Sequence, residues 1–382
     1  MSKLRATTAV AGVAHSGVGT SPGWSPLELL ADASRKALDD AGLTLADVDG
    51  LCAATFYHFF PTLSVGEYLG IQPRWSNSDT VGGSSFLNHI AQATLAINAG
   101  LCEVVLIAYG SNARSSRNLN GLIETPELEK PYDPMVPVSG YALAASRYFH
   151  EYGATREDLA RVANTARQWA ALNPEAELRD PMSIDEILAA PLIASPFSKH
   201  DCCLVSDGGA ALILTSAQRA KQLRKPPIYV LGNASAHWHR EIAQMPDLTV
   251  TAASVTGPQA LEAAGVTHKD IDLVQLYDAF TLNPILFLED LGFCKKGEGA
   301  AFIADGHIQP GGDLPVNTNG GGLAFAHPGA YGLFALIEAV VQLRGAAGQR
   351  QVAKAQTALV HGNGGTLSHQ ATTILGADSC LT

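Results

Sequence analysis

The chain has few charged residues, no CxxC cysteine pair and no long apolar run. Charged residues make up 16% of its 382 residues and leave a net charge of −11, which disfavours nucleic acid and anionic membrane surfaces as partners. Its six cysteines include no CxxC pair and do not have the density of a disulfide framework. No uncharged stretch is long enough to cross a bilayer, and the N-terminal residues lack the apolar run of a signal peptide. We therefore expect a reduced, cytoplasmic protein without a metal site.

Low-complexity segments and a glycine-rich phosphate-binding fingerprint are also missing, so the sequence assigns no nucleotide contacts. Hydrophobic residues, by contrast, reach 47% of the chain. A chain of this length and composition buries a large core, and it is long enough for two domains or one duplicated domain. The composition predicts a compact α/β protein.

An internal repeat organises the two ends of the chain. Residues 37–54 and 260–277 match in register at an offset of 223 (260 − 37): Ala-Leu, an Ala-Gly that ends a helix, a Thr, and Asp-Val/Ile-Asp before a strand. A second helix and strand follow in each copy, over residues 82–110 and 328–362. The pattern predicts a duplicated strand–helix unit in layered sheets, with halves at 1–255 and 256–382.

Residues 111–196 interrupt this pattern. The segment begins with a polar run, contains four prolines between positions 126 and 137, and predicts helices from Ser139 and Thr155. The core resumes with a strand within residues 201–214. An insertion of this kind is typical of a lid or a substrate-binding excursion.

A glycine-rich segment, residues 317–332, leads into the last long helix and reads N-T-N-G-G-G-L-A-F-A-H-P-G-A-Y-G. Three consecutive glycines predict a tight loop rather than a helix at 320–322. Pro328 and Gly345 bracket the predicted helix. His327 and Tyr331 would then lie at the N-terminus of this helix, where free N–H groups and the helix dipole stabilise negative charge.

Several motifs together carry a family resemblance. They are N-x-x-G-G followed by H-P-x-x-x-G in the segment above, S-D-G-G-A-A-L-I-L at 206–214, Y-D-A-F-T at 277–281 and L-G-F-C-K-K-G-E-G at 291–299. With the duplication and the insertion, the chain resembles the thiolase superfamily, in particular its sterol-carrier-protein thiolase branch. The resemblance implies a duplicated five-layer αβαβα fold, a homodimer and an acyl-CoA ligand. Coenzyme A would be part of the substrate, with no separate cofactor.

The chain departs from the thiolase pattern at the catalytic positions. Where a thiolase carries its nucleophilic cysteine, residues 80–85 read T-V-G-G-S-S. His361 matches the second catalytic cysteine, and Tyr277 matches an asparagine that holds an oxyanion-hole water. His327 alone is unchanged. Because acyl transfer needs a thiolate, and the six cysteines are expected to be packing groups, these changes argue against Claisen condensation through an acyl-enzyme.

The same changes resemble the thiolase-like aldolases, which use two tyrosines at positions that match Tyr277 and Tyr331. The implied reaction is retro-aldol cleavage of a β-hydroxyacyl-CoA, with a steroid or other branched side chain, to a ketone or aldehyde and a shorter acyl-CoA. One tyrosine would take the hydroxyl proton, and which one stays open. His327 would donate to the thioester oxygen, and His361 would return a proton to carbon or orient a tyrosine. A positive charge on either histidine would lower the pKa of a phenol.

Four further residues are expected at the substrate. Gly82 and Gly83 would leave room for a branched carbon where the thiol once stood. Asn317 and Gly364 would line the site, with Asn317 also shaping its loop through side-chain bonds to the backbone. Asp278 is expected to brace a loop rather than to titrate in catalysis.

Two other functions remain open from the sequence. The chain would otherwise be a degenerate thiolase or acyl-CoA acyltransferase, or a non-catalytic subunit of a heteromeric thiolase-like complex. The resemblance to the aldolases also implies a small partner protein, with an OB-fold and a zinc ribbon, that closes the acyl-CoA site.

Overall fold

A computed structural model describes residues 3–117 and 127–381. Within them, nine strands form one mixed sheet in the order β3-β2-β4-β7-β1-β8-β11-β10-β9, and a two-stranded ribbon, β5-β6, stands apart. The strands are β1 Thr8–Gly19, β2 Gly50–Ala53, β3 Trp75–Asn77, β4 Val104–Ser111, β5 Leu192–Ala194, β6 Phe197–Ser198, β7 Asp207–Ser216, β8 Ile228–His237, β9 Leu273–Leu276, β10 Thr357–Gly364 and β11 His369–Gly376.

The sheet consists of two equivalent halves, which confirms the internal repeat. The first half runs β2-β4-β7-β1 and the second β9-β10-β11-β8, and the halves join where β1 pairs antiparallel with β8 at Ala9–Tyr229 and Val10–Ile228. The short 3₁₀ turns Leu45–Asp47 and His268–Asp270 carry the same Thr–Asp capping box at the same offset of 223 (268 − 45). The sheet order places β8 (residues 228–237) with the strands of the second half, although it precedes residue 256. The division of the chain into halves at 1–255 and 256–382 stays a prediction.

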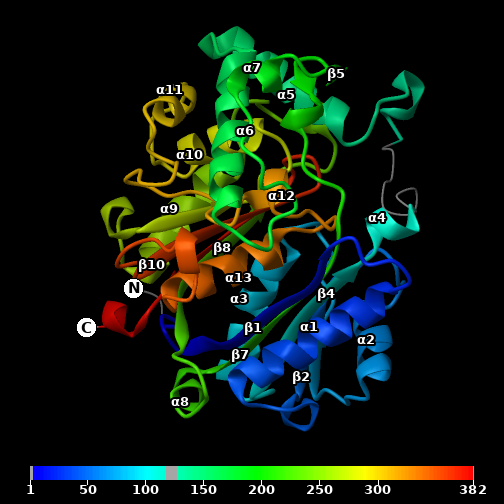
Figure 1. The fold of residues 1–382 in the computed structure, drawn as a ribbon. Coiled ribbons are helices and arrows are strands. Elements are labelled where there is room, and N and C mark those ends of the chain that lie inside the picture. The colour runs from blue at the N-terminus through cyan, green and yellow to red at the C-terminus, as the bar shows by residue number, and fades with distance from the viewer. Residues whose placement is uncertain (1–2, 118–126, 382) are drawn as a thin grey trace.

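Helices form three layers around the two half-sheets. In Figure 1, α1 and α2 cover the outer face of the first half, α9 and α10 cover that of the second, and α3 and α13 lie between the halves. These helices are α1 Pro26–Ala41, α2 Pro61–Leu69, α3 Ser85–Asn98, α9 Ala253–Ala264, α10 Leu282–Asp290 and α13 Gly332–Leu343. The arrangement is the expected five-layer αβαβα fold.

Local sequence explains the boundaries of these elements. Ser25 and Glu28 form a complete capping box at the start of α1, and Gly42 ends the helix at φ 76°. Strand β4 is buried along its whole length because α1 and α3 pack against it, and its sequence is correspondingly apolar or small. Strand β10 is also buried along its whole length, although it carries the polar residues His361 and Asn363.

The insertion is helical and lies over the upper end of the core in Figure 1. Its residues 118–126, including Pro126, lie outside the described part of the chain. On either side of that gap are α4 Ala113–Ser116, the turn Lys130–Tyr132, α5 Val138–Tyr152, α6 Arg156–Ala171 and α7 Ile184–Leu188. The hydroxyl of Tyr148 in α5 bonds Glu289, and that of Tyr141 donates to the Gly365 carbonyl at 3.0 Å. The insertion is thus anchored to the second half; a role as a lid stays a prediction.

The glycine-rich segment differs from the prediction at two points. Residues Gly321–Ala324 form a helical turn, α12, although Gly320 and Gly321 do take the expected positive φ values of 104° and 65°. The following helix begins at Gly332 rather than at Pro328, because Gly329 has a φ of 93° that no helix continues.

The remaining short elements complete the chain. They are α8 Ala217–Ala220, α11 Gly299–Ala304 and the 3₁₀ turns Lys199–Asp201, Ile242–Gln244, Gly348–Arg350 and Asp378–Leu381. Across residues 3–117 and 127–381, none of the helices has both the length and the apolar character that spanning a membrane requires.

Candidate active site

The start of α3, the start of α13 and the end of β9 meet at one place. A Cβ atom added to Gly332, the first residue of α13, would lie 2.1 Å from the Gly83 carbonyl oxygen, so the two helix starts are in direct backbone contact. Tyr277 follows β9 directly, and its N–H donates to the His361 carbonyl at 3.0 Å. Side chains that follow a parallel strand are well placed for ligands, since they stand at the carboxyl edge of the sheet.

The phenol oxygen of Tyr277 is the centre of this junction. It lies 2.9 Å from His327 Nε2, and it accepts a hydrogen bond of 3.3 Å from the backbone N–H of Tyr331. Tyr331 is the N-cap of α13, so this N–H carries the positive end of the helix dipole. The structure therefore joins Tyr277, His327 and Tyr331, and it gives the Tyr277 oxygen a donor suited to stabilising negative charge.

The ring of Tyr277 fills the space beside Gly83. A Cβ at position 83 would lie 1.9 Å from Tyr277 Cε2 and 2.7 Å from its hydroxyl oxygen. Gly82, at φ 91°, packs on the Gly364 Cα, and a Cβ on Gly364 would in turn strike the Val81 carbonyl oxygen at 1.7 Å. The expectation that Gly82 and Gly83 leave open room for a substrate carbon is wrong, because protein atoms occupy that room. Gly364 likewise serves close backbone packing here.

The two phenols do not face each other through their hydroxyls. Tyr331 is fully buried, and its hydroxyl donates to Asn319 Oδ1 at 2.9 Å. Its ring stacks on Phe334, with centroids 6.2 Å apart. Tyr331 therefore meets Tyr277 through its backbone N–H, and the expected pair of cooperating phenol groups is not formed in this arrangement.

Neither histidine supplies a positive charge near neutral pH. Burial lowers the pKa of His327 and that of His361 to about 4. Burial also raises the pKa of Tyr277 and of Tyr331 well above the usual value for a phenol. The expectation of a histidine cation that lowers a tyrosine pKa is wrong, and all four groups are neutral at pH 7.

His361 lies outside the cluster formed by Tyr277, His327 and Tyr331. Its two ring nitrogens bond Thr372 Oγ1 and Gln370 Oε1, each at 2.9 Å, and its ring packs edge-on against Phe287 of the outer helix layer. With both nitrogens occupied there, the imidazole does not orient either tyrosine.

Asn317 acts on its own loop. Its Oδ1 accepts the Leu276 N–H at 2.6 Å, and its backbone has a φ of 52°. The side chain thus fixes the position of the glycine-rich segment against the end of β9, as expected of a loop-shaping asparagine. A contact from Asn317 to substrate stays a prediction.

Three further residues lie on the segments that surround the site: Asp278, Asn319 and Cys203. Asp278 accepts backbone N–H groups from Gly322 at 2.6 Å and Leu323 at 3.4 Å, so it braces the loop as expected. Asn319, which accepts the Tyr331 hydroxyl at 2.9 Å, stands in no motif that marks it as a site residue, and Cys203 is expected from the sequence to be a packing group. The backbone N–H of Cys203 donates to the Ala279 carbonyl at 2.8 Å, two residues after Tyr277. Burial raises the pKa of the Cys203 thiol above its ordinary range, so the thiol stays protonated.

Stability should depend on pH through Asp278. Burial raises the pKa of this carboxyl to about 7. The unfolded value lies near about 3.9, so the folded chain holds a proton that the unfolded chain releases, and the resulting stability is lost as pH rises towards 7. We expect this group to lower the free energy of unfolding by roughly 1–4 kcal/mol between about pH 4 and pH 7. In urea unfolding at several pH values, the free energy of unfolding of Asp278→Asn should change less with pH than that of the unmodified chain. An equal dependence on pH in the two proteins would contradict the assignment.

In residues 3–117 and 127–381, no three His, Cys, Asp or Glu side chains are grouped so as to hold a metal ion. The site is built instead from neutral hydrogen-bonding groups at two helix N-termini. Such an arrangement can move a proton between oxygen and a neighbouring atom and can stabilise an enolate oxygen.

Comparison with known proteins places this geometry in a family. The model of a family described as "Thiolase C-terminal domain-like" matches residues 234–377. A steroid side-chain-cleaving aldolase of Thermomonospora curvata is 33% identical over 372 residues, covering 90% of this chain and 92% of that protein. The chain belongs to the thiolase superfamily.

Other thiolase relatives differ in the reaction that their names give. An acetyl-CoA acetyltransferase of Methanothermobacter thermautotrophicus is 34% identical over 94% of this chain and 96% of its own length. A solved structure named "Ltp2-ChsH2(DUF35) aldolase" superposes with a TM-score of 0.90 at 33% identity, covering 99% of this chain and 100% of that one. Thiolase relatives of similar identity thus include both an aldolase and an acyltransferase, and the site residues must discriminate between these reactions.

Proposed function

We propose that this protein is an aldolase that cleaves a β-hydroxyacyl-CoA, with a steroid or comparable branched side chain, without forming an acyl-enzyme. The observation that carries the proposal is the Tyr277 phenol, set between His327 Nε2 and the Tyr331 N–H, in the space beside Gly83. A thiolase-type nucleophile at position 83 and this tyrosine ring exclude each other sterically. Likeness to a steroid side-chain-cleaving aldolase along 90% of the chain supports the same reaction class.

The reaction requires a proton to leave the β-hydroxyl as the Cα–Cβ bond breaks. Tyr277 accepts this proton while it passes its own to neutral His327 across the 2.9 Å contact. The electron pair of the broken bond moves into the thioester, which becomes an enolate, and the ketone or aldehyde departs. The relay then runs in reverse and Tyr277 protonates the enolate at Cα, so no net proton is gained or lost. Because both groups start neutral, the relay needs no phenolate in the resting enzyme.

The enolate carries negative charge beside two helix N-termini. The segments that lead into α3 and α13 meet at Gly83 and Gly332, and the N-terminal ends of the two helix dipoles favour negative charge at this place. The Tyr331 N–H also stabilises negative charge on Tyr277 during transfer. His361 is given no step, since its nitrogens are held by Thr372 and Gln370.

A thiol-dependent acyltransferase is the second candidate, favoured by one observation, the hydrogen bond of 2.8 Å from the Cys203 backbone N–H to the carbonyl of Ala279, two residues after Tyr277. Replacing this thiol separates the two candidates. Cys203→Ala should retain β-hydroxyacyl-CoA cleavage within about threefold, since the relay uses no sulfur. The assay measures the release of the ketone and of the shortened acyl-CoA. Cys294→Ala, made in the otherwise unmodified chain, is the matched control. A loss of ~10³-fold or more in Cys203→Ala alone would favour the acyltransferase.

We further propose a homodimer that binds a small partner protein with an OB-fold and a zinc ribbon. The name of the solved relative, "Ltp2-ChsH2(DUF35) aldolase", supports a second protein component. Co-expression with a candidate partner should raise turnover of the purified chain. A chain that is fully active alone would remove the need for the partner, and the absence of turnover on any thioester, with or without it, would indicate a non-catalytic subunit.

A further inference from the structure

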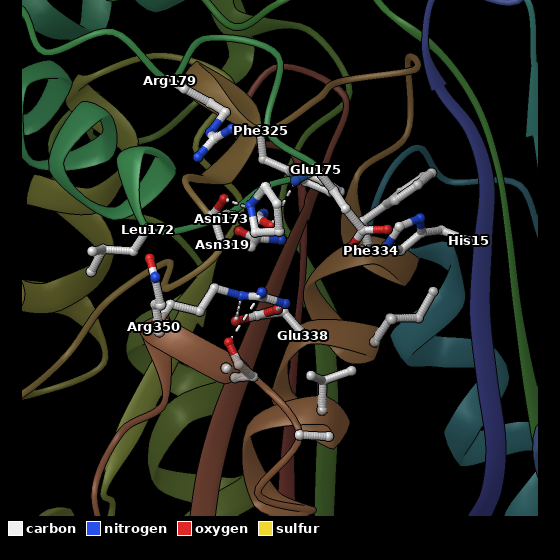
Figure 2. A pocket seen from close by; sticks show the side chains of 17 residues that line it. His15, Leu172, Asn173, Glu175, Arg179, Asn319, Phe325, Phe334, Glu338 and Arg350 are labelled. Atoms are coloured by element: carbon white, nitrogen blue, oxygen red, sulfur yellow. Dashed lines mark hydrogen bonds and ion pairs between the residues drawn. The ribbon is translucent and has the colours of Figure 1, made fainter.

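A cavity of about 640 Å³ lies beside α13, away from the Tyr277–His327 contact. We call it the α13 cavity. It is lined by insertion residues 172–175 and 179, by His15 of β1, by one face of α13 and by the turn Gly348–Arg350 (Figure 2). Its volume falls in the range of pockets that hold small organic ligands.

One wall of the α13 cavity is apolar and aromatic. Phe325 and Phe334 pack edge-on with centroids 6.4 Å apart, and Ile337 and Val341 extend the same surface along α13. Flat rings and branched side chains of this kind give a rigid surface for the apolar body of a ligand.

Among the charged residues of the cavity, Arg350 and Glu338 pair with each other through bonds of 3.0 Å and 2.9 Å. Glu175 lies 3.4 Å from His15, a contact that is an ion pair only when His15 is protonated. Within residues 3–117 and 127–381, Arg179 has neither a hydrogen bond nor an ion pair, and Figure 2 shows its guanidinium directed towards the middle of the cavity. A planar guanidinium without a partner above an apolar wall is suited to a carboxylate.

We propose that the α13 cavity binds an organic monocarboxylate, with its apolar body on Phe325 and Phe334 and its carboxylate paired with Arg179. The site differs from the acyl-CoA site of the proposed function, because Tyr277 and His327 are not among the residues that line it.

The cavity is one residue away from the candidate active site. Asn319 lines the cavity, and its Oδ1 accepts both the Tyr331 hydroxyl and the Gly321 N–H at 2.9 Å. Phe334 stacks on the Tyr331 ring from the cavity side. A bound carboxylate therefore restrains the two groups that position Tyr331, and so modulates turnover; this consequence rests on the proposed function, whereas binding does not.

Calorimetric titration of the whole chain with matched probes tests the site. The probes are 1-naphthaleneacetate and 1-naphthaleneacetamide, which share a shape and differ in charge, together with cholate as a larger carboxylate. We expect at least one of the two carboxylates to bind, and the amide to bind at least tenfold more weakly than naphthaleneacetate. Arg179→Gln should weaken carboxylate binding at least tenfold, while Arg35→Gln, which removes an exposed arginine of α1, should leave it unchanged.

A second variant covers the apolar wall, and a third separates this proposal from the proposed function. Val341→Phe narrows the cavity at its apolar wall and should weaken carboxylate binding at least tenfold, while the melting temperature stays close to that of the parent. Tyr277→Phe should bind the probes normally whether or not it cleaves a thioester. Absence of binding by both carboxylates, or binding that Arg179→Gln does not change, would overturn the site.

Discussion

Tyr277→Phe is expected to lower kcat for β-hydroxyacyl-CoA cleavage by roughly 10²–10⁴-fold, the usual contribution of a positioned acid–base group. The substitution removes only the oxygen that contacts His327 Nε2 and the Tyr331 N–H, and it leaves in place the ring that packs on Gly83. KM should change little, because the lost contact contributes to proton transfer in the transition state rather than to substrate binding. Steady-state kinetics on a tertiary β-hydroxyacyl-CoA measures both constants.

Two variants make this measurement specific. Tyr229 lies in β8, outside the site, and its hydroxyl donates to Asp378 at 2.9 Å. Tyr229→Phe removes this hydroxyl and should leave kcat unchanged. Tyr331→Phe keeps the backbone N–H that reaches Tyr277, so we expect a loss below about tenfold from disturbed positioning alone. A Tyr277→Phe enzyme with normal kcat, or one less impaired than Tyr331→Phe, would remove Tyr277 from the proton relay.

The sequence was most informative where local rules act alone. The ends of α1 are set by local residues. Ser25 and Glu28 form a capping box at its start, and Gly42 takes a positive φ at its end, and both are residue types that mark helix ends in a sequence. The repeat was recognisable because Ala-Leu, Ala-Gly, Thr and Asp-Val/Ile-Asp recur at a constant offset of 223 (260 − 37). The structure shows what the matching Thr and Asp residues do, since Thr44 and Thr267 begin identical capping boxes. A duplicated chain with these signals has few folds open to it, so the layered architecture could be predicted without coordinates.

The candidate site was harder to predict, since its chemistry depends on side-chain direction and burial. Tyr277 and His327 were found because they stand in motifs, and the structure brings their polar atoms to 2.9 Å. The Tyr331 hydroxyl turns to Asn319 because its ring stacks on Phe334, a contact that no sequence spacing reveals. In the same way His361 lies on the strand face that meets Phe287. Burial decides that both histidines are neutral, and burial is known only once the layers are assembled.

Gly83→Ala is expected to damage both activity and stability, because its Cβ would stand 1.9 Å from Tyr277 Cε2. No backbone strain is involved, since Gly83 does not have a positive φ. The tyrosine must therefore leave its place between His327 and the Tyr331 N–H. We expect a loss of activity comparable to that of Tyr277→Phe and a destabilisation of about 1–3 kcal/mol, the range seen for overpacked cores. Gly66→Ala, a helix glycine with ordinary clearance, is the matched control and should be neutral or slightly stabilising.

A double-mutant cycle identifies the cause of this damage. If the Tyr277 ring is what Gly83 makes room for, then Tyr277→Ala should absorb the new methyl group, and Gly83→Ala should cost less than about 0.5 kcal/mol in that background. Urea unfolding of the four proteins gives the coupling energy directly. An unchanged cost in the Tyr277→Ala background would mean that Gly83 is required for the backbone contact with Gly332 instead. Strong coupling would mean that the space beside residue 83, just before α3, can hold either a side chain at that position or the phenol of Tyr277, which follows β9. A nucleophile at position 83 and this phenol could then not be present together.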